Sequence, residues 1–288
     1  MRPTSTEDNL IFHYTSTETL LNILSRRHDK EHLNKNKDNV CFRATHAKFL
    51  NDPTEYEFAL TLLEKSLLKY EKENPGKNGV SQIFTKDSKS DLISLAPGEP
   101  FLFSLAEHSD NLSMWRAYGT DGSGVSIGLD KKMLNEYANA KDIYNTSFIQ
   151  CSYGLNKNIS RLTTFWSTLY DNMPLYIQKR AIEGRDFQKF LRILEHCFSI
   201  KSEAYKEENE WRLCTNEAFK KNIKYRIRSG LIIPYIEHYF IKDIIKRIVI
   251  GPCADKELSE KSIIMVLKTF GYNMNNISVI KSIVPYRV

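Results

Sequence analysis

The sequence predicts an α+β fold in which a mixed, mostly antiparallel sheet forms the core and a helical insertion lies near the middle. Short apolar runs typical of buried strands occur from residues 10–14 to residues 277–280. These runs do not alternate with helices in the strict manner of doubly wound parallel sheets. Between residues 160 and 206, apolar side chains instead follow a helical period.

A single domain is expected over residues 1–288, since a chain of this length suits one large domain or two small ones and no internal repeat divides it. Residues 71–94 are rich in Lys, Ser and Gly, with only scattered apolar residues. This composition predicts a polar surface insertion. The helical insertion near residues 160–206 is the second departure from the sheet.

The composition excludes several classes of protein. Apolar residues make up 41% and charged residues 26% of the chain, as in ordinary globular proteins. The net charge is +6 and the pI is about 8.9. Nucleic-acid binding is indicated by composition alone only when the pI exceeds ~9. No apolar run approaches ~18 residues and no signal peptide is evident, so we expect a cytoplasmic protein without membrane contact.

The five cysteines are expected to be reduced and mostly buried. They are odd in number and never form a Cys-x-x-Cys pair, so neither a disulfide framework nor a cysteine-ligated zinc is predicted. His28 and His32 are four residues apart, but their segment is highly polar and no third ligand is apparent. The sequence therefore predicts no metal site.

The first half of the chain is expected to combine strands with two capped helices. Thr15 and Glu18 fit a capping box that begins a helix. Residues 51–55 form a second capping box with Pro53 at the first helical position. The strands predicted in this half cover residues 10–14, 39–44, 101–105 and 125–129.

Beyond the helical insertion the sequence predicts strands over residues 211–215, 223–228, 248–250 and 277–280. A helix from about Asp255 to Phe270, ended by Gly271, separates the last two. The glycines of residues 119–124 lead into a strand, so they predict a tight turn and not a nucleotide-binding loop. The Gly-x-Ser-x-Gly motif of serine hydrolases is missing from the sequence.

Three stretches bring ionisable or aromatic side chains to predicted buried elements. Strand alternation places His13 on one face with Ile11 and Thr15, where a histidine suits the edge of a core as well as a site. Trp115 and Tyr118 lie one helical turn apart and form a single aromatic face, which is also typical of a core.

The third stretch is the start of the strand predicted after the helical insertion. Glu210 and Arg212 share one face there, while Trp211 and Leu213 share the other. The pair is either a surface ion pair of little consequence or a catalytic carboxylate with its orienting partner. The pattern alone leaves both interpretations open.

An ordered set of short motifs spans almost the whole chain. The motifs are Phe12-His13-Tyr14-Thr15-Ser16, Asn51-Asp52-Pro53-x-Glu55, Phe103-Ser104, Met114-Trp115-x-x-Tyr118, Glu208-x-Glu210-Trp211-Arg212, Ile250-Gly251-Pro252 and Pro285-Tyr286-Arg287. As a set they resemble a large bacterial family catalogued as a domain of unknown function. That resemblance implies membership and leaves the activity open.

The opening of the chain also resembles, more distantly, the ADP-ribosyltransferases, which include DNA-modifying toxins and RNA 2′-phosphotransferases. The likeness lies in His13 at the end of the first strand, in Thr15-Ser16 and in a helix containing Leu-x-x-Ile-Leu. It implies a central sheet like that of the ADP-ribosyltransferase fold and NAD as substrate. It also implies that His13 bonds a ribose and that Glu210 anchors the 2′-hydroxyl of the nicotinamide ribose.

The resemblance assigns further roles within the same site. Ser104 is the choice for the middle catalytic position, over Phe42 or Tyr118. The residues expected to bind NAD are Thr15, Arg43, Trp115, Tyr118 and Arg212. Trp115 and Tyr118 would form a wall for the nicotinamide ring, and Arg43 or Arg212 would clamp a phosphate.

The activity implied is that of an NAD-using ADP-ribosyltransferase or NAD glycohydrolase, with a nucleic acid or a protein as acceptor. A bacterial toxin or a phage-defence effector is the natural setting. The nicotinamide–ribose bond breaks through an oxocarbenium-like state, which a fixed carboxylate stabilises. We therefore expect His13 and Glu210 on neighbouring strands, facing one pocket that Trp115 or Tyr118 borders.

Two other functions remain open from the sequence. In a nucleic-acid-binding or nuclease-like protein, Lys224, Arg226 and Arg228 would share one strand face and grip phosphates, with Lys220 and Lys221 nearby. The same stripe also suits an ordinary solvated strand face. The third possibility is a non-catalytic binding module of the same fold.

Overall fold

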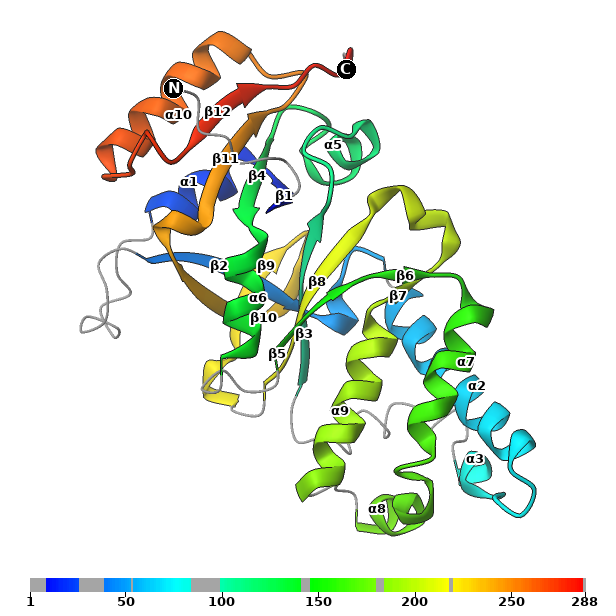
Figure 1. The fold of residues 1–288 in the computed structure, drawn as a ribbon. Helices are drawn as coiled ribbons and strands as arrows, with labels where there is room; N and C mark the ends of the chain where they lie inside the picture. Colours follow the sequence, from blue (N-terminus) through cyan, green and yellow to red (C-terminus); the bar gives the residue numbers. More distant parts are fainter. Residues whose placement is uncertain are drawn as a thin grey trace.

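The computed structural model describes residues 9–25, 39–52, 54–83, 99–140, 146–179, 184–217 and 220–286. Their fold is α+β, as the sequence predicts, with a mixed and mostly antiparallel central sheet. Helices cover parts of this sheet, and a group of helices lies beside it (Figure 1). Within these ranges, no helix is long and apolar enough to cross a membrane. His28 and His32 fall outside the described residues.

Ten strands form the central sheet. They are β1 (Leu10–Thr15), β2 (Asn39–His46), β3 (Glu99–Ala106), β4 (Val125–Asp130), β5 (Thr146–Gln150), β8 (Glu210–Glu217), β9 (Lys224–Arg228), β10 (Leu231–Ile241), β11 (Ile245–Ile250) and β12 (Ser278–Lys281). The main path runs β12-β11-β4-β1-β3-β2-β10-β9, and β8 pairs with β3 and β5. Only the β11–β12 pair is parallel within this described sheet.

The sheet forks at β3. On one side, β3 pairs with β8 along its whole length, from Glu99 to Ala106. On the other side it pairs with β1 at Ala106 and with β2 at Phe101 and Leu102. Between these two contacts, residues 103–105 have no strand partner on that side. Strands β1 and β2 therefore diverge from a common neighbour and leave space between them.

The helical lobe consists of α2 (Thr54–Glu73), α3 (Val80–Ile83), α7 (Leu155–Trp166), α8 (Met173–Lys179) and α9 (Gly184–Phe198). These helices lie together at one end of the molecule, away from α10 (Lys256–Thr269) and β12 (Figure 1). Leu62, Leu63, Phe190 and Trp166 are fully buried in the core of the lobe.

The helical insertion differs in its bounds from the sequence prediction. Helices begin at Leu155 and end at Phe198, and the chain then enters a two-stranded parallel ladder of β6 (Ser152–Tyr153) and β7 (Ile200–Lys201). Residues 203–208 form a 3₁₀ segment. The last residues of the expected insertion are therefore a short strand of a separate two-stranded sheet and part of a 3₁₀ segment, instead of α-helix.

The expected polar insertion at residues 71–94 packs against the helical lobe where it is described. It starts with the last turn of α2 and continues into α3, where Val80 is buried. Glu71 accepts hydrogen bonds from the Ser81 backbone N–H at 2.9 Å and from the Tyr170 hydroxyl at 2.6 Å. Residues 84–94 lie outside the described part of the chain.

Strand β1 is buried on both faces. Ile11 packs with helices α1 (Thr17–Ser25) and α10, whereas Phe12 and Tyr14 pack on the other side against α5 (Leu112–Tyr118). Strand alternation requires this division, because successive side chains point to opposite faces of the sheet. The remaining helix of the sheet region, α6 (Lys131–Asn139), follows β4 and contacts β4 and β5.

The helix caps differ in detail from the sequence prediction. Ser16, and not Thr15, caps α1, because its hydroxyl accepts a hydrogen bond from the Thr19 N–H at 3.1 Å. Asp52 caps α2 by accepting from the Thr54 N–H at 2.8 Å. Glu55 does not complete a capping box there, since its carboxylate bonds to Arg212 at 2.8 Å.

The turn at residues 119–124 is tight, as its glycines predict. Thr120 and Asp121 both have positive φ angles. A Cβ at Gly124 would lie 2.3 Å from the Thr15 carbonyl oxygen, so only glycine allows β4 to begin this close to the end of β1.

His238 is buried in β10 and makes stability sensitive to acid. Burial lowers its pKa from 6.5 to about 4. The unfolded chain therefore binds a proton more readily, so the contribution of His238 is complete above pH 6.5 and is lost as the pH falls towards 4. For one group the slope is at most about 1.4 kcal/mol per pH unit. In urea unfolding experiments, we expect the free energy of unfolding of His238→Asn to fall less steeply than that of wild type as the pH decreases from 6.5 to 4.5.

The matched control is His108→Asn, at an exposed position, which should keep the wild-type slope. An unchanged slope in His238→Asn would contradict the assignment of a neutral buried imidazole.

Candidate functional site

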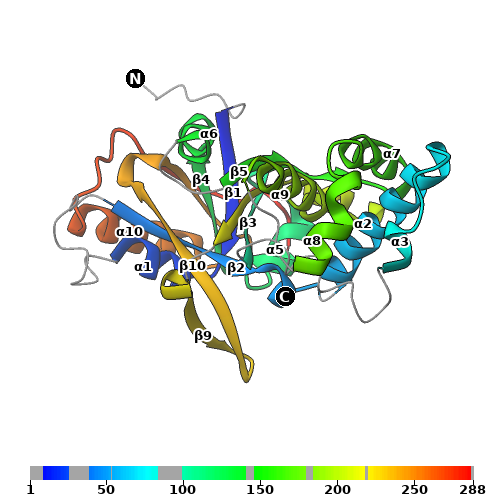
Figure 2. The same ribbon diagram turned by 90° about the horizontal axis from the view of Figure 1, so that it is seen from below.

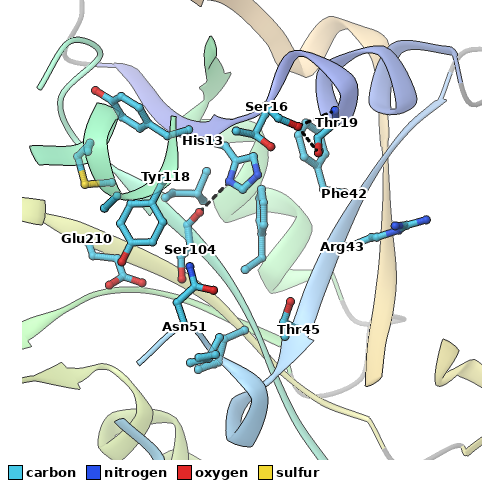
Figure 3. Close-up of a pocket in the computed structure, with 18 of the residues that line it drawn as sticks. His13, Ser16, Thr19, Phe42, Arg43, Thr45, Asn51, Ser104, Tyr118 and Glu210 are labelled. Carbon is cyan, nitrogen blue, oxygen red and sulfur yellow. Dashed lines mark hydrogen bonds between the residues drawn. The ribbon is translucent and has the colours of Figure 1, made fainter. Parts of the chain in front are cut away.

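A cavity of about 700 Å³ opens where β1 and β2 diverge from β3. This volume lies within the range of small-molecule pockets. Side chains from β1, β2, β3, β8 and β9 line it, together with α5 and the 3₁₀ segment before β8. His13, Ser104, Tyr118 and Glu210 surround a common space in Figure 3. The fork in the sheet therefore positions the candidate site.

His13 is a neutral hydrogen-bond acceptor at the fork. Its Nδ1 lies 3.1 Å from the carbonyl oxygen of Ser104, which can only accept, so Nδ1 carries the proton. Burial, assisted by the charge of Arg226, lowers the pKa of His13 to about 4 against the opposing effect of the Ser104 bond. At neutral pH, Nε2 therefore holds a lone pair and can accept a hydrogen bond from a hydroxyl group.

The backbone of β3 explains why the imidazole is held in this way. The Ser104 carbonyl lies on the stretch that pairs with neither β1 nor β2, and His13 supplies the missing donor. Phe103 packs against the same imidazole ring, with 4.8 Å between ring centroids. Both contacts fix the orientation of His13.

Ser104 and Glu210 belong to one face of the sheet. The β3–β8 register pairs Ser104 with Arg212 and Ala106 with Glu210, and paired residues in antiparallel strands point to the same side. Strand β3 lies between β1 and β8, so His13 and Glu210 are one strand further apart than the sequence analysis expects. They nevertheless line the same cavity.

Glu210 lies in a buried set of five charged side chains, the acidic network, made of Glu55, Lys201, Glu208, Glu210 and Arg212. The Lys201 ammonium contacts carboxylate oxygens of Glu208 at 2.6 Å, Glu210 at 2.7 Å and Glu55 at 3.1 Å. All five residues line the cavity. Three carboxylates and two cations leave one net negative charge when every group is ionised.

Arg212 fixes the orientation of two of these carboxylates by hydrogen bonds. Its Nε donates to Glu210 at 2.7 Å, one Nη donates to Glu55 at 2.8 Å, and the other donates to the Phe198 carbonyl at 2.6 Å. The side chain is only 2% exposed. Arg212 therefore supports Glu210, and the expected role as a free phosphate clamp is wrong.

The two carboxyl groups nearest the cavity have opposite pKa shifts. Burial favours a higher pKa for Glu210, but the charges of Arg212 and Lys201 outweigh it and hold the pKa at about 2. For Glu208, burial raises the pKa despite the attraction of Lys201. Glu210 is thus a permanent anion at neutral pH, whereas Glu208 is the better proton acceptor.

Tyr118 borders the cavity and Trp115 does not. The Tyr118 hydroxyl donates to Glu208 at 3.1 Å. Trp115 is fully buried, donates its indole N–H to Asp110 at 2.6 Å and packs edge-on against Tyr14. The expected nicotinamide wall at Trp115 is therefore wrong, because this face of α5 packs on β1.

Thr15 and Arg43 line the cavity, but neither is a free polar group at its centre. Thr15 is buried at the end of β1. The Arg43 guanidinium lies 4.5 Å from the Tyr235 ring and 4.0 Å from the Glu237 carboxylate, which offsets its charge. In Figure 3, Arg43 lies far from Glu210 across the view.

Sequence reasoning missed three members of the site: Glu55, Lys201 and Glu208. Glu55 fits a capping box by spacing, and Lys201 falls inside the expected helical insertion. Glu55 and Glu208 both stand in the short motifs noted in the sequence, and Glu208 lies two residues before Glu210; these were the available signals. Among the described residues, no group of His, Cys, Asp and Glu side chains could hold a metal ion.

Lys201→Met tests the acidic network. It removes the cation shared by three carboxylates at a position where the side chain is 3% exposed. Breaking a buried ion pair leaves uncompensated charge, so we expect the free energy of unfolding to fall by about 3 kcal/mol. Urea denaturation monitored by circular dichroism measures this change.

Lys206→Met is the matched control, since Lys206 pairs with Glu203 on the surface. An exposed pair of this kind contributes less than about 1 kcal/mol. Equal losses in the two variants would contradict a special role for Lys201.

Comparison with known proteins gives one match. The model of a family described as "Protein of unknown function (DUF2971)" matches residues 114–213. No curated protein matches the chain. No solved structure matches it either. The matched stretch contains Tyr118, Lys201, Glu208, Glu210 and Arg212. Over residues 114–213, which carry most of the acidic network, the chain is therefore similar to this family.

Proposed function

We propose that the cavity binds NAD and that the protein breaks the bond between nicotinamide and ribose, transferring ADP-ribose to an acceptor or to water. The observation that carries this proposal is the composition of the cavity lining: the net negative acidic network, the neutral acceptor of His13 and the hydroxyl of Ser104. These groups match the needs of a sugar that becomes positively charged as it reacts.

The reaction requires stabilisation of positive charge without addition of an oxidant or a reductant. The C1′–N bond breaks and its electron pair passes to the nicotinamide nitrogen, which becomes neutral. An oxocarbenium ion remains on the ribose. A lone pair of the acceptor then forms the new bond to C1′, and the acceptor releases one proton. With water as acceptor, the products are nicotinamide, ADP-ribose and a proton.

Glu210 is suited to stabilise the developing charge. Arg212 and Lys201 keep it ionised and fixed, so its orientation needs no change during the reaction. Preorganised charge of this kind is a major source of catalysis in enzymes. The unused acceptor capacity of its Oε1, which accepts one hydrogen bond from Arg212, is available to the ribose 2′-hydroxyl.

His13 and Ser104 would bind the sugar, and Glu208 would accept the proton of the acceptor. A neutral imidazole with a free Nε2 accepts from a ribose hydroxyl, which a protonated imidazole could not do. Glu208 has the raised pKa of a general base and is hydrogen-bonded by Tyr118. Tyr118 also supplies an aromatic ring at the cavity wall for the nicotinamide.

Glu210→Gln tests this proposal through nicotinamide release. We expect kcat to fall by about 10²-fold or more, the scale for removing a preorganised contact to the transition state. The Kd for NAD should change far less, because the carboxylate acts mainly once positive charge develops. Nicotinamide is measured by chromatography with water, oligonucleotides and proteins as acceptors.

The assay is run at a temperature where circular dichroism shows the variant to be folded, since Glu210 is buried against two cations. Glu203→Gln, on the exposed 3₁₀ segment, is the matched control and should release nicotinamide at the wild-type rate. Equal rates for Glu210→Gln and wild type would remove Glu210 from the mechanism. Failure of wild type to release nicotinamide with any acceptor would reject the proposed reaction.

A further inference from the structure

Two cationic side chains of the cavity have no carboxylate partner. Arg226 and Arg228, both from β9, line the cavity, and neither pairs with an Asp or Glu among the described residues. The other cations of the wall are compensated: Arg212 and Lys201 by the acidic network, and Arg43 by Glu237. An unbalanced positive charge therefore lies beside the mouth of the fork.

Arg226 also holds a buried donor that nothing accepts. One of its Nη groups donates to the Thr45 hydroxyl at 2.9 Å, but its Nε is buried without a hydrogen-bond partner. A buried donor without an acceptor is costly, and such groups are rare in folded proteins. Burial and the neighbouring charge of Arg228 also lower the pKa of Arg226, as expected for a cation in an unfavourable place.

The two arginines are spaced to bind two anionic groups. Strand pairing with β10 places residues 226 and 228 on the same face of β9. Residues two apart on a strand are about 7 Å apart. Guanidinium groups bind phosphate oxygens in a bidentate manner, which suits them to a pair of linked phosphates. Arg228 is held towards the cavity by its 2.7 Å hydrogen bond to Asn51.

We propose that Arg226 and Arg228 form a diphosphate-binding site, which makes nucleoside diphosphates and their derivatives the substrate class of the cavity. This inference rests on the proposed function only in assigning the diphosphate to NAD. The anion would accept the orphaned N–H of Arg226 and neutralise both guanidinium groups.

The proposal also sets the direction of the bound molecule. The acidic network repels phosphates, whereas β9 attracts them, so the diphosphate lies towards β9 and the reacting sugar towards Glu210. His13 lines the same cavity, and the charge of Arg226 helps to lower its pKa. Because the imidazole is neutral, it repels neither the diphosphate beside β9 nor the sugar beside Glu210.

Isothermal titration with ADP and with inorganic diphosphate tests the site in the full chain. We expect Arg226→Met to raise the Kd for both ligands by about tenfold or more, which is the effect of losing a charged hydrogen-bonding group. Arg228→Met should raise the Kd for both ligands as well. Because Arg228 is exposed, this variant tests the site even if Arg226→Met fails to fold. Arg192→Met removes the same charge from the exposed surface of α9 and should leave both affinities unchanged.

Thermal melting provides a second readout that a structural role would not produce. Without ligand, the melting temperature of Arg226→Met should stay close to that of wild type, since the change removes a half-buried uncompensated charge together with a single hydrogen bond to Thr45. ADP should raise the melting temperature of wild type and not of the variant. A large fall in the variant without ligand would show that Arg226 supports the fold instead of a ligand.

The outcomes separate the diphosphate site from the proposed reaction. Loss of ADP binding in Arg226→Met supports the site even if wild type never releases nicotinamide. Unchanged ADP binding in both variants overturns the site even if nicotinamide is released. A third outcome would also overturn the diphosphate site: wild type binds single-stranded DNA but not ADP, and the two arginine variants lose the DNA binding. The arginines would then belong to a nucleic-acid-binding surface.

Discussion

The buried cations Lys201 and Arg212 connect the two parts of the structure. Their partners come from four elements: Glu55 opens α2, the Phe198 carbonyl ends α9, Glu208 precedes β8, and Glu210 lies within it. The helical lobe and the sheet therefore meet at these charges. Because buried charges are tolerated only when each is paired, the five side chains constrain the relative positions of all these elements.

The fork at β3 gives this junction its access to the cavity. A continuous sheet would satisfy the β3 backbone on both sides and would leave no room for a ligand beside Glu210. Divergence of β1 and β2 leaves residues 103–105 without a strand on one side, and His13 satisfies part of the exposed backbone. One irregularity thus creates the opening, fixes the imidazole tautomer and places it opposite the carboxylates (Figure 3).

Apolar strand patterns in the sequence predicted most of the strands of the sheet. They failed where polar residues or proline interrupt the apolar run, or where the periodicity is weak. The strand β10 was missed because Pro234 and two polar residues interrupt its apolar run. Pro234 is tolerated because β10 pairs with β2 only from Tyr235 onward, so at Pro234 it has a strand partner on one side only. The short helix α6 and the strand β5 were also missed, since neither carries a strong periodic signal. The α+β class survived these omissions because it rests on strands that do not alternate strictly with helices, and the missed elements do not change that order.

The sequence predicted the residues that the strands contribute to the candidate site, but it did not predict the charged side chains that pair with them. His13, Ser104 and Glu210 line one cavity, but no local pattern shows that Lys201 and Glu55 come from distant segments to meet Glu210. Helical spacing placed Trp115 and Tyr118 on one face, yet the two differ in environment because α5 packs one of them against β1. Long-range contacts decide which member of such a pair faces a ligand.

The hairpin of β9 and β10 projects from the sheet (Figure 2), and β9 is its outer strand. Tyr225 and Ile227 on its outward face are 64% and 81% exposed. An edge strand with exposed apolar side chains on one face can pair with another chain, and charged side chains on the strand oppose such pairing. Arg226 and Arg228 therefore carry a second consequence: neutralising them, by substitution or by a tightly bound anion, would also weaken the barrier to self-association along this edge.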